Sequence, residues 1–163
     1  MVYRQDGGVR HSYDVTVTWT GNQGTGTSHY RAYRRDHTVT TAGRPVLLGS
    51  ADPTFHGDRG RWNPEQLLLA ALSQCHLLSY LHVCVNQGVV VTDYADEATG
   101  TMTTDPDGSG RFTEVLLRPR VTVADVSMVK PAEKAHHEAN RLCFIANSVS
   151  FPVRHEPVVQ GPA

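Results

Sequence analysis

Apolar and polar positions alternate in the first third of the chain. In the stretch YDVTVTWT (13–20), two valines and a tryptophan alternate with threonines, which predicts a half-buried strand. Residues 1–11 show no such pattern, and we expect a flexible lead-in there. The Pro, Gly and Asp of 50–62 predict a loop. Further antiparallel strand is expected over 27–35 with 37–41, and over 45–49.

A long helix is predicted over NPEQLLLAALSQCHLLSYLHVCVNQG (63–88). Asn63 can cap it, Pro64 suits the first helical position and Gly88 is a plausible stop. Its leucines and alanines cover most of the circumference, which is typical of a buried helix.

The second half of the chain returns to strand patterns. Strands are expected at 89–94, 97–104 and 111–124, the last two joined across DPDGSG, followed by a helix over 131–146 and a strand over 151–159. This order predicts an α+β fold with an antiparallel sheet. At 163 residues, a single domain over 12–163 is expected.

Charge and cysteine content narrow the function classes. Fifteen basic and sixteen acidic residues leave a net charge of −1, so no nucleic-acid or anionic-membrane partner is expected. The longest run free of charged residues, 66–92, is too polar for a lipid span. The first residues lack the apolar region of a secretory signal. Three cysteines, an odd number, fit a reducing cytoplasm better than a disulfide scaffold.

The cysteines differ in their neighbours. Cys84 lies between two valines, and its nine-residue separation from Cys75 puts the two on opposite helix faces, so it is expected to be a packing residue. Cys143 lies near the end of the second helix, where it could pack or form a redox pair. Cys75 has polar neighbours, which suggests that this side of the helix opens on a cavity. These neighbours are Ser73, Gln74, His76 and Ser79.

The nine histidines do not form a metal motif. His76 and His82 do not share a helix face, and His136 and His137 diverge. No zinc spacing or GxSxG is present, so neither a metal site, a cofactor nor a hydrolase is expected. We interpret His76 as a structural residue.

The stretch NPEQLLLAALSQCH (63–76) resembles the signature of the OsmC/Ohr family of thiol peroxidases. In that signature a cysteine follows ten residues after the glutamate of an NPE motif, as Cys75 follows Glu65, and Cys143 lies where the second family cysteine is expected. The order of elements over about 13–159 also matches. The resemblance implies an OsmC-like fold, with antiparallel sheets packed around a long buried central helix and a second helix, in an intertwined homodimer.

The resemblance also implies a chemistry. Cys75 would be the peroxidatic thiolate that reduces an organic hydroperoxide to an alcohol and becomes a sulfenic acid. Cys143 would then form a disulfide with it, and a lipoyl-type dithiol would restore both thiols.

The family pairs this thiolate with an arginine held by the glutamate, here Glu65. Arg35 is the preferred candidate; Arg31 lies on the same face if 27–35 is extended, and Arg59 and Arg61 are further candidates. Because Glu65 and Cys75 lie about 15 Å apart along one helix, the glutamate is more easily supplied by a partner subunit. We therefore expect a C2 dimer with its site at the interface.

Two alternatives remain open. The same fold could bind a small apolar ligand without catalysis, with its cysteines as packing residues, or it could act as a redox sensor without turnover. A bridgeable distance between Cys75 and Cys143 favours the peroxidase.

Overall fold

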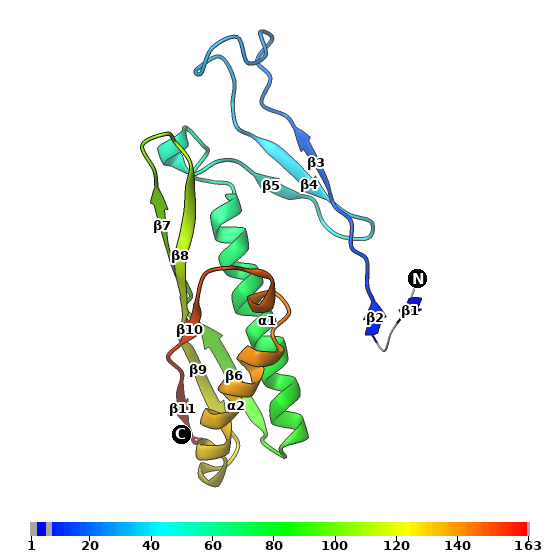
Figure 1. Cartoon of the computed structure of the whole chain (residues 1–163), viewed down its shortest axis with the longest axis vertical. Coiled ribbons are helices and arrows are strands. Elements are labelled where there is room, and N and C mark those ends of the chain that lie inside the picture. The colour runs from blue at the N-terminus through cyan, green and yellow to red at the C-terminus, as the bar shows by residue number, and fades with distance from the viewer. Residues whose placement is uncertain (1–2, 6–7, 163) are drawn as a thin grey trace. The chain divides into compact units, whose positions relative to one another are not determined.

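The computed structural model describes residues 3–5 and 8–162 and divides into two compact units (Figure 1). The N-terminal unit comprises residues 1–67 and the C-terminal unit residues 68–163. Within the predicted lead-in, the described residues form a hairpin of β1 (Tyr3–Gln5) and β2 (Gly8–Arg10), whereas residues 1–2 and 6–7 lie outside the described part.

The N-terminal unit contains a three-stranded antiparallel sheet in the order β3-β4-β5. Its strands are β3 (Thr16–Trp19), β4 (His37–Thr40) and β5 (Leu47–Gly49). A short 3-10 helix, η1 (Pro53–Phe55), interrupts the predicted loop. All three strands fall in segments where strand was expected, and the register places Val17, Val39 and Leu47 side by side on one face.

The strand predicted over 27–35 is wrong, because the chain forms turns there. Gly24 and Gly26 adopt positive φ angles, which turn the chain before this segment. Arg35 then folds back over the rings of Tyr30 and Tyr33, at 4.4 and 4.3 Å from their centres. This cation–π packing favours a curled loop over an extended strand.

Helix α1 spans Pro64–Asn86 and begins with a reciprocal cap. The Gln66 amide donates to Asn63 Oδ1 at 2.8 Å, and the Asn63 amide donates to Gln66 Oε1 at 3.4 Å. Two amide groups that the first turn cannot pair are thereby satisfied. The chain leaves the helix at Gly88, whose φ of 69° favours glycine.

The C-terminal unit holds two three-stranded sheets and helix α2 (Val129–Leu142). One sheet has the order β10-β8-β7 and the other β11-β9-β6. Two 3-10 helices flank α2: η2 (Val126–Met128) and η3 (Ala146–Ser148). The strands are β6 (Val91–Asp96), β7 (Thr99–Thr104), β8 (Gly110–Leu117), β9 (Pro119–Val123), β10 (Val153–His155) and β11 (Val158–Gln160).

Two apolar clusters hold the C-terminal unit together along α1. Leu72 packs with Val115 and Leu117 of β8. Further along the helix, Tyr80 and Val83 belong to a second cluster, with alanines of α2 and valines of β9. Helix α1 is therefore the central element of this unit, with α2 beside its C-terminal half (Figure 1).

The strand predicted over 111–124 is divided in two at Arg118-Pro119. Pro119 lacks an amide, and the Arg118 amide donates to Asp96 Oδ1 at 2.7 Å instead of to a neighbouring strand. The other oxygen of Asp96 accepts a hydrogen bond from Ser73 of α1 at 2.5 Å. At this break the chain therefore passes from one sheet to the other, and Asp96 connects the junction to α1 by hydrogen bonds.

The single strand predicted over 151–159 is also two strands, and both run parallel to their neighbours. Strand β10 pairs with β8, and β11 pairs with β9. The expected purely antiparallel sheet is therefore wrong, although the α+β class is confirmed.

Helix α1 is less buried than its composition predicted. By length and composition it is the one helix in the described residues that could cross a membrane, yet only 28% of the corresponding 18-residue window is buried. Leu72, His76 and Tyr80 are fully enclosed by the C-terminal unit, which makes α1 the core helix of a folded unit. Leu78 and Val85, in contrast, are 64% and 75% exposed.

Candidate active site

Two thiols meet between α1 and the end of α2. Cys75 lies in the middle of α1 and is partly exposed, whereas Cys143 is the C-cap residue of α2 and is 1% exposed. Their side chains are close enough for Cys75 to raise the pKa of Cys143, and both are free thiols. The structure therefore brings together the two cysteines that the sequence singled out.

The surroundings of Cys143 favour its protonated form. Burial raises its pKa to about 11, and the hydrogen bond with Cys75 acts in the same direction. The Ala146 amide, which donates to the sulfur at 3.4 Å, opposes this rise but does not cancel it. Cys143 is consequently a thiol at neutral pH.

Cys84 takes no part in this pair. It is buried in the cluster that joins α1 to α2, close to Tyr80, and burial raises its pKa. A small apolar packing role fits this position.

Two of the polar neighbours of Cys75 contact other elements of the unit rather than a cavity. Ser73 binds Asp96, and His76 Nε2 lies 3.0 Å from Nδ1 of His136 in α2. The polar residues around Cys75 were expected to line a cavity. Ser73 and His76 instead form hydrogen bonds with residues of neighbouring elements.

His136 was not recognised as a partner of His76 from the sequence. Spacing along one helix predicts which histidines share a face of that helix. It does not predict contacts between histidines on two different helices. A signal was nevertheless present, because His136 lies in the same stripe of α2 as Ala132 and Ala139, which are fully buried. Within the residues that the structure describes, no group of three or more metal-binding side chains could hold an ion.

Glu65 stands in the first turn of α1. Its Oε2 atom is buried and has no hydrogen-bond partner among the described residues. Burying a carboxylate oxygen without a partner costs free energy. This atom is therefore a candidate to bind a cation or to accept a hydrogen bond.

The arginine candidates are engaged to different extents. The Arg35 guanidinium donates to the carbonyl oxygens of Tyr30 and Tyr33, each at 2.8 Å, in addition to stacking on their rings. Arg61 lies 3.8 Å from Asp36 and 3.6 Å from Asp58. Arg31 is exposed, and Arg59 lies near enough to Asp52 to help lower the pKa of that carboxyl, which is lowered chiefly by hydrogen bonds from Thr54.

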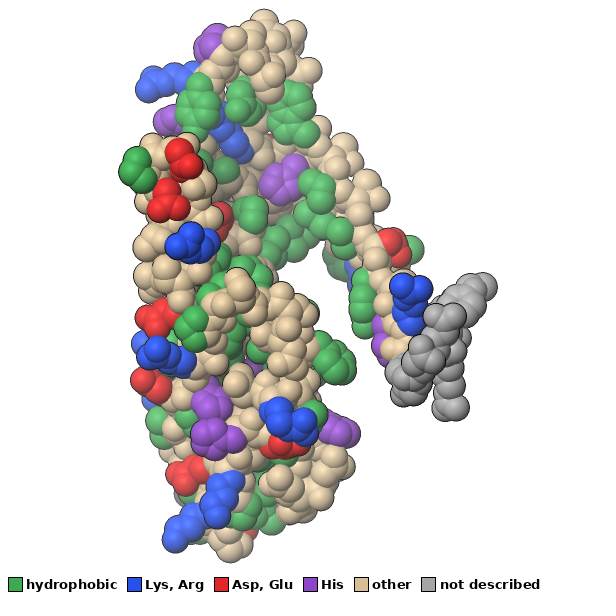
Figure 2. Space-filling view, in the orientation of Figure 1, with side chains coloured by type: hydrophobic (Ala, Val, Ile, Leu, Met, Phe, Trp, Pro, Cys, Tyr) green, Lys and Arg blue, Asp and Glu red, His purple; other side chains and the backbone are tan. Residues whose placement is uncertain are grey.

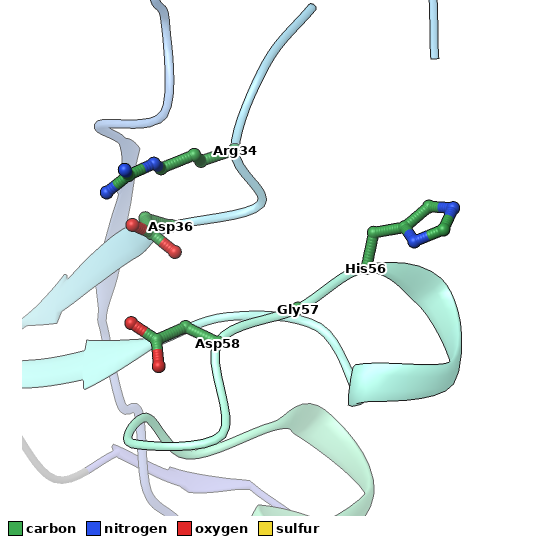
Figure 3. A pocket seen from close by; sticks show the side chains of 5 residues that line it. All are labelled: Arg34, Asp36, His56, Gly57 and Asp58. Atoms are coloured by element: carbon green, nitrogen blue, oxygen red, sulfur yellow. The ribbon is translucent and has the colours of Figure 1, made fainter. Parts of the chain in front are cut away.

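A polar pocket of about 320 Å³ lies within the N-terminal unit (Figure 3). Arg34, Asp36, His56, Gly57 and Asp58 line it, and His56 turns its ring away from the two carboxylates. The buried Asp36 accepts a hydrogen bond from Ser50 at 3.1 Å, and the Ser50 hydroxyl accepts one from the Asp58 amide. These bonds tie the loop after η1 to the sheet, which is a structural role.

Comparison with known proteins agrees with this geometry. A protein-family model described as OsmC-like protein matches residues 56–157. An OsmC-like protein of unknown function from Vibrio cholerae is 32% identical, with a TM-score of 0.81 over 91% of this chain and 100% of its own. The chain belongs to the OsmC-like protein family.

Two solved structures that are named as organic hydroperoxide resistance proteins have lower sequence identity to this chain. An organic hydroperoxide resistance protein from Legionella pneumophila shares 20% identity, with a TM-score of 0.66 over 93% of this chain and 99% of its own. The organic hydroperoxide resistance protein OhrB of Bacillus subtilis shares 19%, with a TM-score of 0.57 over 91% and 98%. At this identity they support the fold. No curated protein sequence matches the chain.

Proposed function

We propose that this protein is a thiol peroxidase that reduces organic hydroperoxides through Cys75 and Cys143. The observation that carries the proposal is the nearness of the two thiols, seen in the effect of Cys75 on the pKa of Cys143, because a dithiol mechanism needs sulfur atoms that can bond with little movement. The names of the hydroperoxide resistance relatives point to the same class of substrate.

The unequal environments of the thiols assign their roles. Cys75 is the more accessible one and meets the substrate, whereas the buried Cys143 keeps its proton at neutral pH. The Cys75 thiolate attacks the hydroperoxide, the O–O bond breaks, and the departing alkoxide takes up a proton to become the alcohol. Cys75 is left as a sulfenic acid.

The second step consumes the sulfenic acid. The Cys143 sulfur bonds to Cys75, and the sulfenic oxygen leaves as water together with the Cys143 proton. An external dithiol of the lipoyl type then reduces the disulfide to two thiols and is itself oxidised to a disulfide. No cofactor is required.

A cation near Cys75 would complete the site, since a partly buried thiolate needs positive charge. We assign this role to an arginine held by Glu65, whose Oε2 has no partner among the described residues. Arg35 is the proposed residue, although using it requires the guanidinium to leave the rings of Tyr30 and Tyr33, which makes Arg31, Arg59 and Arg61 competitors.

We further propose that two copies form a C2 dimer with the site at their interface. Each unit exposes an apolar surface that suits a partner: Leu78 and Val85 on α1, and on the N-terminal sheet Val17, which is 62% exposed. Figure 2 shows hydrophobic side chains at the surface of both units. Large exposed apolar surfaces are typical of interfaces.

The test is to add one equivalent of cumene hydroperoxide to the fully reduced protein and to map its peptides by mass spectrometry. The expected product is a Cys75–Cys143 disulfide that forms within the mixing time. It disappears in Cys75→Ser, and it persists in Cys84→Ala, the matched control. Slow oxidation spread over all three cysteines would instead favour an apolar-ligand-binding protein with packing thiols. A disulfide that forms without turnover would favour a redox sensor.

A further inference from the structure

Two hydrogen bonds, one buried and one part-buried, link three elements of the C-terminal unit. His155 of β10 donates from Nε2 to the backbone oxygen of His136 at 3.1 Å. His136 in turn shares a proton with His76 across 3.0 Å, so β10, α2 and α1 are connected in series. The His136 ring also stacks on Tyr80, with ring centres 4.0 Å apart.

Both imidazoles of the pair are fully enclosed. His76 and His136 have no exposed surface, and burial lowers their pKa values to about 4 and about 3. They are therefore neutral at pH 7, and one donates while the other accepts. Their remaining nitrogens, His76 Nδ1 and His136 Nε2, have no partner among the described residues.

Packing alone does not account for this pair. Two apolar side chains of similar volume would fill the same space without leaving two buried nitrogens unsatisfied, and such nitrogens cost free energy. The feature that apolar residues cannot reproduce is a directional bond, which fixes the separation of α1 and α2 at one point.

The two histidines lie on the same two helices as the thiols. His76 directly follows Cys75 on α1. His136 precedes Cys143 by seven residues, two helical turns, and therefore lies on the same face of α2. A change in the separation of the helices at the imidazoles is thus transmitted to the sulfur atoms.

We propose that the His76–His136 hydrogen bond is a positioning device, which holds α1 and α2 so that Cys75 and Cys143 can close a disulfide. This rests on the proposed redox role of the two thiols. A disulfide requires an S–S bond of about 2.0 Å and a Cα separation within roughly 4.4–6.8 Å. Side-chain rotation can meet these limits only while the backbones stay in place.

The equilibrium between the dithiol and the disulfide tests this inference without any hydroperoxide. The chain is equilibrated with mixtures of reduced and oxidised dithiothreitol, and the Cys75–Cys143 disulfide is quantified after acid quenching. The informative variant is His76→Leu with His136→Leu, which removes both partners and leaves no unpaired nitrogen behind. Its folding is checked by thermal unfolding.

The double leucine variant is expected to lower the equilibrium constant for disulfide formation about tenfold, because helices that are no longer held together present the two sulfur atoms to each other at a lower effective concentration. His76→Gln and His136→Asn, whose amides can occupy the places of Nε2 and Nδ1, are expected to stay within about threefold of the unmodified chain. His82→Leu, on the same helix but outside the pair, is the matched control and leaves the constant unchanged.

An unchanged constant in the folded double leucine variant overturns the inference. So does a tenfold loss in both amide variants, because the hydrogen bond would then be irrelevant to the effect. If the double leucine variant does not fold, His76→Leu is compared with His76→Gln: a tenfold loss in His76→Leu alone supports the inference, and equal constants overturn it. Failure of the unmodified chain to react with hydroperoxide would refute the proposed function but leave this equilibrium measurable.

Discussion

Cys143 and Cys75 show how much one side chain's surroundings decide its chemistry. Both are thiols on helices, yet burial and the neighbouring sulfur raise the pKa of Cys143 to about 11. Only a thiolate is a good nucleophile. In the proposed mechanism Cys143 therefore reacts only after Cys75 has been oxidised.

The rate at which iodoacetamide alkylates Cys143 in the reduced protein is expected to follow the raised pKa of this thiol. Because its pKa is near 11, Cys143 is labelled slowly at pH 8, and its labelling rate rises as the pH approaches 11. Peptide mass spectrometry after timed quenching separates Cys143 from Cys75 and Cys84. Rapid labelling of Cys143 at pH 8 would contradict the assignment.

The sequence identified the residues of the thiol pair but not the residues around it. Glu65 and Cys75 follow a local spacing that one helix carries, so a motif can reveal them. The partner of His76 depends on how two helices pack, and no local pattern encodes that. The arginine partner is still a prediction for the same reason, since Arg35 is held in a loop by Tyr30 and Tyr33.

At the scale of elements, the histidine pair couples the packing of α1 and α2 to pH. Buried His76 and His136 bind protons less readily in the folded chain, with pKa values of about 4 and 3, than in the unfolded chain, where the value is near 6.5. Their contribution to stability is complete above pH 6.5. It is lost as the pH falls from 6.5 through 4 towards 3.

Urea unfolding between pH 7 and pH 4 is expected to reveal this loss. The free energy of unfolding decreases as the pH falls, because the two histidines bind protons in the unfolded chain at pH values where they stay neutral in the folded chain. In the variant with His76→Leu and His136→Leu, the decrease is smaller by the contribution of these two groups. Equal pH dependence in both proteins would show that the pair does not titrate on unfolding.

The elements themselves were predictable where the signal was local. Asn63 and Pro64 predict the start of α1, and the alternation of apolar and polar residues in 13–20 predicts β3. The strand pattern over 111–124 did not reveal the break, because the break depends on Asp96, far away in the sequence, accepting a hydrogen bond from the Arg118 amide. The parallel pairing of β10 and β11 is likewise a tertiary property that strand patterns do not contain.

At the scale of the whole molecule, the exposed side of α1 is the surface that the proposed dimer would cover. Leu78 and Val85 lie seven residues apart, on one face of the helix, and both are exposed in the single chain. In the proposed dimer these two side chains are covered.

Replacing both residues, in a variant with Leu78→Lys and Val85→Lys, is expected to shift the dimer to monomers. Burying two unpaired charges at an interface should raise the dissociation constant by at least about tenfold. Sedimentation velocity over a concentration series measures the change. Val126→Lys, at another exposed apolar position outside α1, is the matched control, and a monomeric unmodified chain would refute the dimer.

The parallel strands β10 and β11 also impose an order in time during synthesis. Each closes one sheet of the C-terminal unit, so neither sheet can be complete before residues 153–160 have been made. At roughly 5–20 residues per second, the 66 residues between the end of α1 at Asn86 and the start of β10 at Val153 take about 3–13 s to translate. During that interval the two sheets that pack against α1 are incomplete.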